Sequence, residues 1–195
     1  MTALNDLSLT QFSEALASGE PTPGGGAAAA LSGALGAALL AMVCRFTVGR
    51  EKFASVEDEV QNILAEADAA RARFHLAVEA DAAAYAAVGA AYRLPRSTEE
   101  EKAARGAAIR SASWSAAQPP LDVAEEAAAL VALCQRAASI TNPMLGSDIT
   151  TAVALARAAI EGGAANVDAN VSGLTDAQAA DLRQRIQNAR ERGGA

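Results

Sequence analysis

The sequence predicts an all-α protein, a single up-and-down bundle of about seven helices. Of its 195 residues, 53 are alanine, the strongest helix former, whereas 4% are aromatic and 6 are proline. Strands need aromatic and β-branched side chains to cover a pleated face, and these are scarce. The hydrophobic content of 51% suffices for one core. We therefore expect a single domain over residues 1–195.

Two helices are predicted before the turn at Gly49. Ser8 and Gln11 form a capping box, which starts a helix over 8–18. The run PTPGGG then opens into a second helix over 26–48. The segment from Pro21 to Cys44 contains no charged residue, so this helix is expected to be the buried centre of the bundle. Its small residues recur every fourth position, which suits close helix packing and association into a dimer; they are Ala29, Gly33, Ala37 and Ala41.

The middle of the chain carries the longest apolar pattern. It predicts a helix over 55–94, roughly 60 Å long at about 1.5 Å per residue, and we expect that helix to break or kink. A capping box at Thr98 and Glu101 starts a helix over 98–117, and Pro119–Pro120 separates it from another over 120–139. The inward stripe of the long helix comprises Val60, Ile63, Ala67, Phe74, Val78, Asp81, Tyr85, Val88 and Tyr92.

Two more helices complete the predicted bundle. One covers 147–170, after the loop TNPMLG, and the other covers 175–192, after a third capping box at Thr175 and Gln178. The tail from 190 to 195 ends in Gly-Gly-Ala and is expected to fray.

Composition also argues against several classes of protein. With 16 Lys and Arg against 23 Asp and Glu, the chain lacks the basic character of nucleic-acid binders. One histidine and two separated cysteines do not make a metal site. The uncharged helix could span a bilayer by length, but it is only weakly apolar and lacks an aromatic belt, so we expect no membrane association. Cys44 and Cys134 are interpreted as buried thiols in a cytoplasmic protein, and the amino terminus resembles no secretory signal.

Asp81 is the first candidate for chemistry, because it interrupts the apolar stripe of the long helix. A buried carboxylate is costly unless it is paired, hydrogen-bonded or shifted in pKa. The structural alternative is an aspartate satisfied by Tyr85 one turn later, or by an arginine from a neighbouring helix. His75 on the same helix could assist as a base, although a lone histidine is more often a packing or surface residue.

Three other groups of residues are candidates for binding. The glycine run before the second helix offers free N–H groups that could hold an anion, or it is simply a tight turn. Arg45, Arg50 and Lys52 form a small cationic group at the far end of that helix, where cations also complement the helix dipole. Asp148 begins a later helix as a first-turn acid. Asn166 and Asn170 share one face of that helix, either for bonds between helices or as the polar rim of a heteroaromatic ligand site.

Three segments together resemble the formiminotransferase-cyclodeaminase carboxy-terminal family, and within it the free-standing bacterial cyclohydrolases. They are PTPGGGAAAALSGALGAALLAMVCRFTVGREKF, DAAAYAAVGAAYRLPRSTEEEKAAR and SDITTAVALARAAIEGGAANVDAN. The match covers almost the whole chain in order. The resemblance implies an all-helical homodimer that acts on one-carbon folates, with the active site in a cleft near the subunit interface.

The resemblance also transfers site residues to this chain. Asp81 and Lys52 match the catalytic positions, with Asp81 as the acid. Ala27 stands where the family often has serine, and the basic run reads Arg50-Glu51-Lys52 instead of uniform lysine. The substrate-binding positions implied are Pro23, Gly24, Gly25, Gly26, Arg50, Tyr85, Asp148, Asn166 and Asn170.

The implied reaction is hydrolysis of 5,10-methenyltetrahydrofolate to 10-formyltetrahydrofolate, without a metal or any cofactor beyond the folate. Asp81 would stabilise the cationic substrate and move the proton of the attacking water. The alternative is a cyclodeaminase that closes a formimino group and releases ammonia. Cyclodeaminases are usually fused to a transferase domain, so a chain of this length favours the cyclohydrolase. A helical scaffold that has lost catalysis is the third possibility.

Overall fold

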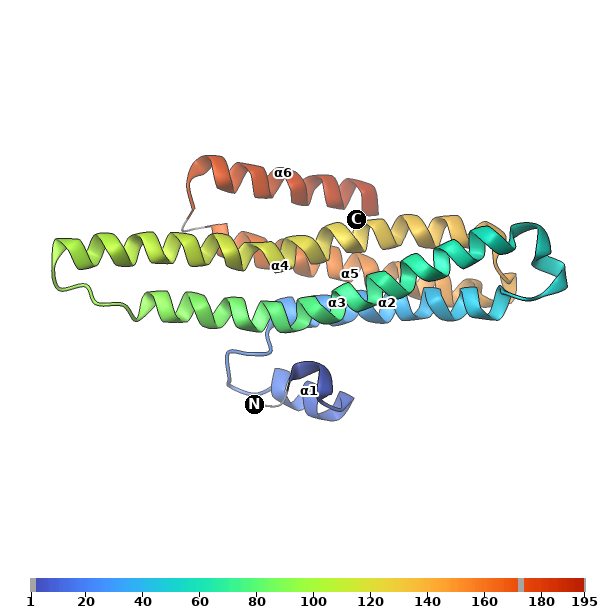
Figure 1. Ribbon diagram of the computed structural model, residues 1–195, viewed down its shortest axis with the longest axis horizontal. Helices are drawn as coiled ribbons and strands as arrows, with labels where there is room; N and C mark the ends of the chain where they lie inside the picture. Colours follow the sequence, from blue (N-terminus) through green and yellow to red (C-terminus); the bar gives the residue numbers. More distant parts are fainter. Residues whose placement is uncertain (1–2, 172–173, 195) are drawn as a thin grey trace.

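Four long helices form the body of the protein in the computed structural model, which describes residues 3–171 and 174–194 (Figure 1). Helix α2 packs against α3 and α5, and α4 packs against the same two helices, so that the four enclose one core. No strand is assigned within the described ranges, which confirms the all-helical prediction. The four helices are α2 (Gly25–Thr47), α3 (Glu57–Tyr92), α4 (Glu99–Ile140) and α5 (Gly146–Asn170).

Two shorter helices lie on the outside of this bundle. Helix α1 lies below it in Figure 1 and α6 lies above it, where α6 packs on α4 and α5. The described chain thus holds six α-helices, where about seven were predicted. The shorter helices are α1 (Leu9–Leu16) and α6 (Asp176–Gly193), and the 3-10 segments are η1 (Leu4–Asp6), η2 (Glu51–Val56) and η3 (Pro143–Leu145).

All three predicted capping boxes are present. Ser8, Thr98 and Thr175 each accept a hydrogen bond from the backbone N–H three residues later. In each case the Gln or Glu at that later position bonds back to the cap residue. These reciprocal bonds satisfy backbone donors that the first helical turn leaves free, which explains why this local sequence signal located the helix starts so closely.

The predicted break at Pro119–Pro120 is wrong, because α4 runs through both prolines. Proline has no N–H, so Pro120 leaves the carbonyl of Ala116 without its usual partner in the helix. Asn170 on α5 supplies one: its Nδ2 donates to that carbonyl at 3.3 Å. At the same place α5 approaches very closely, since a Cβ on Gly163 would lie 2.5 Å from the carbonyl oxygen of Pro120. Packing against α5 therefore compensates for the prolines.

The expected break in the long helix is also absent, since α3 is continuous from Glu57 to Tyr92. The residues before it, 51–56, form the separate segment η2. The turn ahead of η2 is held by Gly49, which has a positive φ of 74° and donates its N–H to the carboxylate of Glu57. A left-handed backbone favours glycine, so the turn at this position follows directly from the sequence.

Helix α2 is the core helix that its composition predicted. Its small-residue stripe is buried, and Gly33 lies so close to α3 that a Cβ would be 2.5 Å from the ring of Phe74. Although α2 is long and apolar enough to cross a membrane, 61% of its apolar window is buried in the protein. The stripe thus packs against other helices of the same chain, so it no longer supports the predicted dimer. Its members are Ala29, Gly33, Ala37 and Ala41.

Beyond the start of α2, helices α3 and α4 continue as a two-helix projection, seen at the left of Figure 1. We call it the α3–α4 extension, residues 82–92 and 99–115. Tyr85 and Tyr92 continue the inward stripe of α3 in phase, yet each is 54% exposed. Their expected burial is wrong because α2 begins, and α5 ends, near the level of Asp81, so that neither of these two helices covers them.

The carboxy-terminal prediction also needs correction. Helix α6 includes residues 190–193, which were expected to fray, and Gly193 is buried. The carbonyl of Gly193 accepts a hydrogen bond from Arg157 Nε of α5 at 3.1 Å. Arg190 pairs with Glu161 through both carboxylate oxygens. These contacts hold the last turn on the bundle, while Ala195 lies outside the described residues.

Candidate active site

The carboxylate of Asp81 lies at the first turn of α2. Its Oδ2 accepts a hydrogen bond from the backbone N–H of Ala27 at 3.0 Å. A Cβ on Gly26 would lie 2.8 Å from Oδ2 and would overlap Oδ1. Glycine at position 26 therefore lets a side chain of α3 reach the backbone of α2. The free N–H groups and positive dipole of a helix start suit a negative group at this place.

Burial sets the chemical state of Asp81. The side chain is half-buried, and desolvation raises the pKa of its carboxyl above the ordinary value of 3.8, while the bond from Ala27 acts in the opposite direction. No salt bridge to Asp81 occurs among the described residues, and exposed Tyr85 donates no hydrogen bond to it there. A carboxylate that is partly desolvated and not neutralised suits proton transfer and contact with a cation.

The start of α2, which Asp81 contacts, is also approached by α5. Buried Pro23 and the amino-terminal cap Gly24 lead into α2. Gly25 faces α5, where a Cβ would be 3.2 Å from Nδ2 of Asn166. Asn166 is itself bonded to the carbonyl of Gly162 in its own helix at 2.8 Å. The start of α2 is thus close to both Asp81 and Asn166, and the roles of these residues in catalysis and substrate binding stay predictions.

Asn170 makes the bond between helices that was one of its two predicted uses. Its Nδ2 donates to the carbonyls of Ala116 and Asn166, at 3.3 and 2.9 Å. Its role in binding a ligand stays a prediction.

The other predicted site residues lie at the opposite end of α2. Arg50 and Lys52 are exposed at and after the Gly49 turn, and Lys52 Nζ lies 5.4 Å from the ring centre of Phe53. Asp148 is in the first turn of α5. The two segments meet where Asn142 donates its N–H to Thr47 Oγ1 at 3.1 Å. We call this the η2 end.

Within one chain, these two groups cannot form a single site. Asp81 contacts Ala27 near the start of α2, and Lys52 follows its end at Thr47. The 20 helical steps from Ala27 to Thr47 span roughly 30 Å at about 1.5 Å per residue. Motif spacing along the chain could not show this separation, because the direction of α2 places the two motifs at opposite ends of the bundle.

Two further residues considered from the sequence have structural contacts. His75 is exposed on α3, and its Nδ1 lies 3.1 Å from Oδ1 of Asn5. Asn5 also donates to the carbonyl of His75, so this pair fastens the amino-terminal segment to the bundle. Arg45 forms an ion pair with Asp68 at 2.6 Å. Neither residue lies beside Asp81 in the contacts described.

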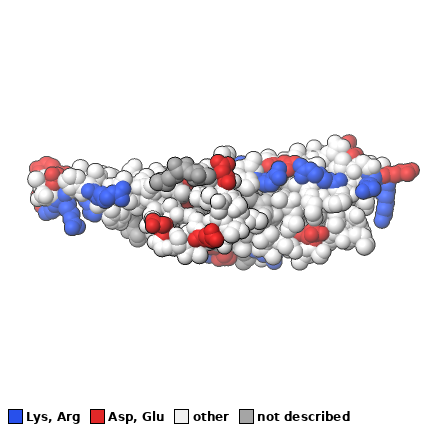
Figure 2. Space-filling model, turned by 90° about the horizontal axis from the view of Figure 1, so that it is seen from below, with Lys and Arg blue, Asp and Glu red and all other residues white. Residues whose placement is uncertain are grey.

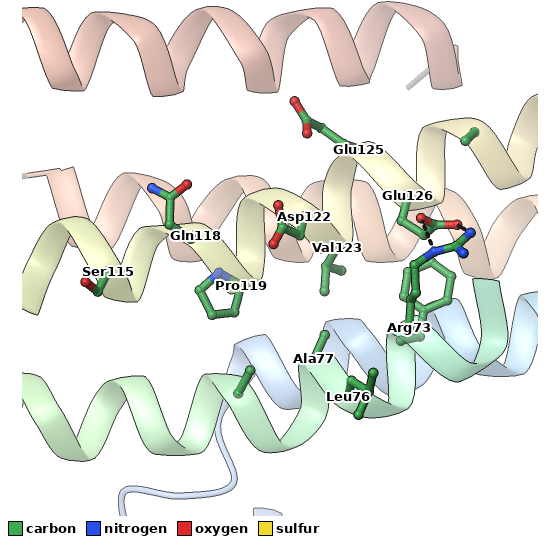
Figure 3. Close-up of a pocket in the computed structure, with 13 residues that line it drawn as sticks. Arg73, Leu76, Ala77, Ser115, Gln118, Pro119, Asp122, Val123, Glu125 and Glu126 are labelled. Carbon is green, nitrogen blue, oxygen red and sulfur yellow. Dashed lines mark hydrogen bonds and ion pairs between the residues drawn. The ribbon is translucent and has the colours of Figure 1, made fainter. Parts of the chain in front are cut away.

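A groove of about 650 Å³ lies between α3 and α4 and was not predicted from the sequence (Figure 3). Arg73 binds both carboxylate oxygens of Glu126 across it, at 2.8 and 2.7 Å. Burial, followed by the nearby charge of Glu125, raises the pKa of Asp122 on the same side. Ala77 in the groove is one helical turn from Asp81 along α3. The three acidic residues that follow the proline pair, Asp122, Glu125 and Glu126, were the sequence feature that could have indicated this groove. The arginines on α3 and α6 that pair with two of them are brought close only by the tertiary fold.

Metal-binding residues were also sought. Across residues 3–171 and 174–194, no cluster of three or more His, Cys, Asp or Glu side chains is positioned to bind a metal ion. Cys44 and Cys134 are buried free thiols, and burial raises their pKa to about 11 and about 12.

The sequence profile of the formiminotransferase-cyclodeaminase family matches residues 8–188 of this chain. The chain belongs to this family. It is 40% identical over 172 residues to a methenyltetrahydrofolate cyclohydrolase of Methylorubrum extorquens, an alignment that covers 88% of this chain and 83% of that protein. It is 34% identical over 174 residues to the rat formimidoyltransferase-cyclodeaminase, of which the alignment covers 32%.

A solved structure of this family has the same fold. The formiminotetrahydrofolate cyclodeaminase of Thermotoga maritima superposes with a TM-score of 0.81 at 28% identity, over 97% of this chain and 95% of that one. The family assignment and the all-helical fold predicted from the three sequence motifs are thereby confirmed.

Proposed function

We propose that this member of the formiminotransferase-cyclodeaminase family hydrolyses 5,10-methenyltetrahydrofolate to 10-formyltetrahydrofolate. The observation that carries the proposal is the carboxylate of Asp81, held at the start of α2 by the Ala27 N–H and by no cation within the described chain. The methenyl substrate is an amidinium cation, which such a carboxylate stabilises. The 40% identity to a protein named as this cyclohydrolase supports the same reaction.

In the proposed mechanism, the oxygen of a water molecule attacks the bridging carbon while Asp81 takes one of its protons. The resulting carbinolamine then collapses: the carbon forms a carbonyl, the bond to N5 breaks with its electron pair on nitrogen, and protonated Asp81 returns a proton to N5. The formyl group remains on N10, and one proton is released overall. Because the substrate carbon is already electrophilic, we propose that the hydrolysis of this C–N bond needs no metal and no cofactor besides the folate.

The test is the loss of methenyl absorbance in the presence of purified protein, compared with the spontaneous reaction in the same buffer. Asp81→Asn keeps the shape of the side chain but removes the base, so we expect a loss of about 10²- to 10⁴-fold with an unchanged circular dichroism spectrum. Unchanged turnover in this variant would remove the role assigned to Asp81.

A second reaction is favoured by a specific observation, since the structural neighbour and the rat relative are both named as cyclodeaminases. Ammonia release from a 5-formimino substrate, without methenyl hydrolysis, would select that reaction. A protein that binds no folate in a calorimetric titration would instead be a non-catalytic scaffold.

We further propose that the protein is a cytoplasmic homodimer that associates with neither nucleic acid nor membrane. Two buried free thiols are consistent with a reducing compartment. Light scattering at micromolar concentration tests the dimer, and a monomer would contradict it.

A further inference from the structure

We propose that the groove between α3 and α4 binds a small organic cation, an amine attached to an apolar body, at a site separate from Asp81. Three properties of the groove support this binding (Figure 3). They are its size and apolar lining, its uncompensated negative charge, and a backbone carbonyl that lacks its helical donor. The proposed folate reaction is not needed for any of them.

The groove is large enough for a small molecule, and much of its lining is apolar. Its volume of about 650 Å³ lies within the range of about 300–1,000 Å³ that is typical of ligand sites. In Figure 3, Ala77 of α3 and Pro119 and Val123 of α4 point into the space between the two helices. Leu76 at the same groove is 71% exposed, so an apolar body bound there would remove apolar surface from water.

The groove also carries an excess of negative charge. Asp122, Glu125 and Glu126 line it together, whereas acidic side chains mostly stand apart on the face shown in Figure 2. Glu126 is paired with Arg73, and Glu125 is paired with Arg185. Asp122 forms no ion pair within the part of the chain that the structure describes. Burial and the charge of Glu125 raise the pKa of Asp122, and the opposing effect of Arg185 is smaller. A cation is therefore the charge that the groove lacks.

A backbone carbonyl adds a second free acceptor. Pro119 has no N–H, so the carbonyl of Ser115, four residues earlier, lacks its usual helical donor, and both residues line the groove. The neighbouring carbonyl of Ala116 receives the amide of Asn170, but no described side chain donates to the carbonyl of Ser115. An ammonium group has N–H donors and no acceptor, so it matches this carbonyl and the carboxylate of Asp122 better than an alcohol or a carboxylate does.

Phenethylamine is the probe for this site, because it joins an ammonium group to a phenyl ring at neutral pH. In a titration followed by nuclear magnetic resonance, we expect it to shift the backbone amide signals of the groove residues until saturation. Phenethyl alcohol has the same ring and chain without the charge, and it should bind about five- to tenfold more weakly. The absence of saturable shifts in the groove, or equal binding of the alcohol, would overturn the proposal.

Two substitutions test the charge and the shape of the groove separately. Asp122→Asn keeps the shape but removes the charge, so it should weaken the binding of phenethylamine about five- to tenfold. Asp58→Asn is the matched control, since it removes an exposed acid in the first turn of α3 and should leave binding unchanged. Ala77→Leu fills the groove without changing its charge, and it should also weaken binding. Wild-type affinity in either groove variant would overturn the proposal.

Asp81→Asn distinguishes this site from the proposed active site. The carboxylate of Asp81 reaches Ala27 at the start of α2, and Asp81 does not line the groove. Phenethylamine should therefore bind this variant as tightly as it binds the wild type, whether or not the wild type hydrolyses a folate. A loss of phenethylamine binding in Asp81→Asn would overturn the proposal.

Discussion

The carboxylate of Asp81 occupies the space that a side chain at position 26 would fill. This relationship joins two motifs far apart in the sequence, the end of the glycine run and the interrupted apolar stripe of α3. Glycine at this position therefore has a steric purpose, which is to let the acid reach the Ala27 N–H. It follows that the glycine and the acid should be sensitive to substitution together.

Gly26→Ala should inactivate the protein without unfolding it. The added Cβ would overlap the Asp81 carboxylate and push it away from Ala27, and a misplacement of about 1 Å costs on the order of 10²-fold in rate. Hydrolysis of the methenyl substrate measures the effect. Gly89→Ala is the matched control, because it lies on α3 and its Cβ would meet only the guanidinium of Arg93, at 3.4 Å. Equal activity of the two variants would contradict the steric account.

Asp81→Asn should make the protein more stable at neutral pH, although it removes the proposed base. Because burial raises the pKa of Asp81 in the folded state, the charged form opposes folding above that raised pKa. The cost disappears as the pH falls below the unfolded value of about 3.8, where the group is neutral in both states. The stability difference from wild type, measured by urea unfolding at several pH values, should therefore be positive at pH 7 and shrink towards acid pH. A difference that grows in acid would show that the pKa is lowered instead.

Asn170→Ala should destabilise the protein more than Asn166→Ala. The Ala116 carbonyl has no backbone donor in α4 because Pro120 lacks an N–H, so removal of the Asn170 amide leaves it without a donor. An unsatisfied carbonyl costs about 1–3 kcal/mol of stability when buried, and less at this half-buried place. Asn166 bonds to Gly162 within its own helix, where the backbone N–H four residues later is already available. Urea unfolding of both variants measures the difference. Equal stabilities would mean that solvent satisfies the Ala116 carbonyl.

Sequence reasoning succeeded where the deciding interaction is local. The capping boxes at Ser8, Thr98 and Thr175 and the turn at Gly49 depend on neighbours within a few residues, and all were found in the structure. It failed where a distant element decides. Pro119–Pro120 does not end α4 because α5 packs closely there and supplies a donor, and no local pattern contains that information.

The same limit applies to the candidate site. The glycine run, Asp81 and Asn166 were each recognised by their own motif, and the fold brings them together. Lys52 and Asp148 were assigned to the same site, yet the direction of α2 carries them to the other end of the bundle. A sequence motif identifies a residue type and a position on a helix, but the tertiary fold decides at which end of the bundle that position lies.

Gly33→Ala should destabilise the fold, although alanine is the better helix former. The new Cβ would lie 2.5 Å from the ring of Phe74, which is 1% exposed, so the ring or one of the two helices would have to shift. Overpacking of this kind costs about 1–3 kcal/mol, whereas the gain from replacing a helical glycine is only about 0.5–1 kcal/mol, so steric overlap decides the sign. Gly106→Ala on α4 is the control and should stabilise, since its Cβ would meet only the flexible end of Arg110. Adding Phe74→Leu to Gly33→Ala should recover part of the lost stability, measured by urea unfolding. If the double variant instead loses more stability than the two single variants added together, then α2 and α3 do not depend on this contact for their close approach.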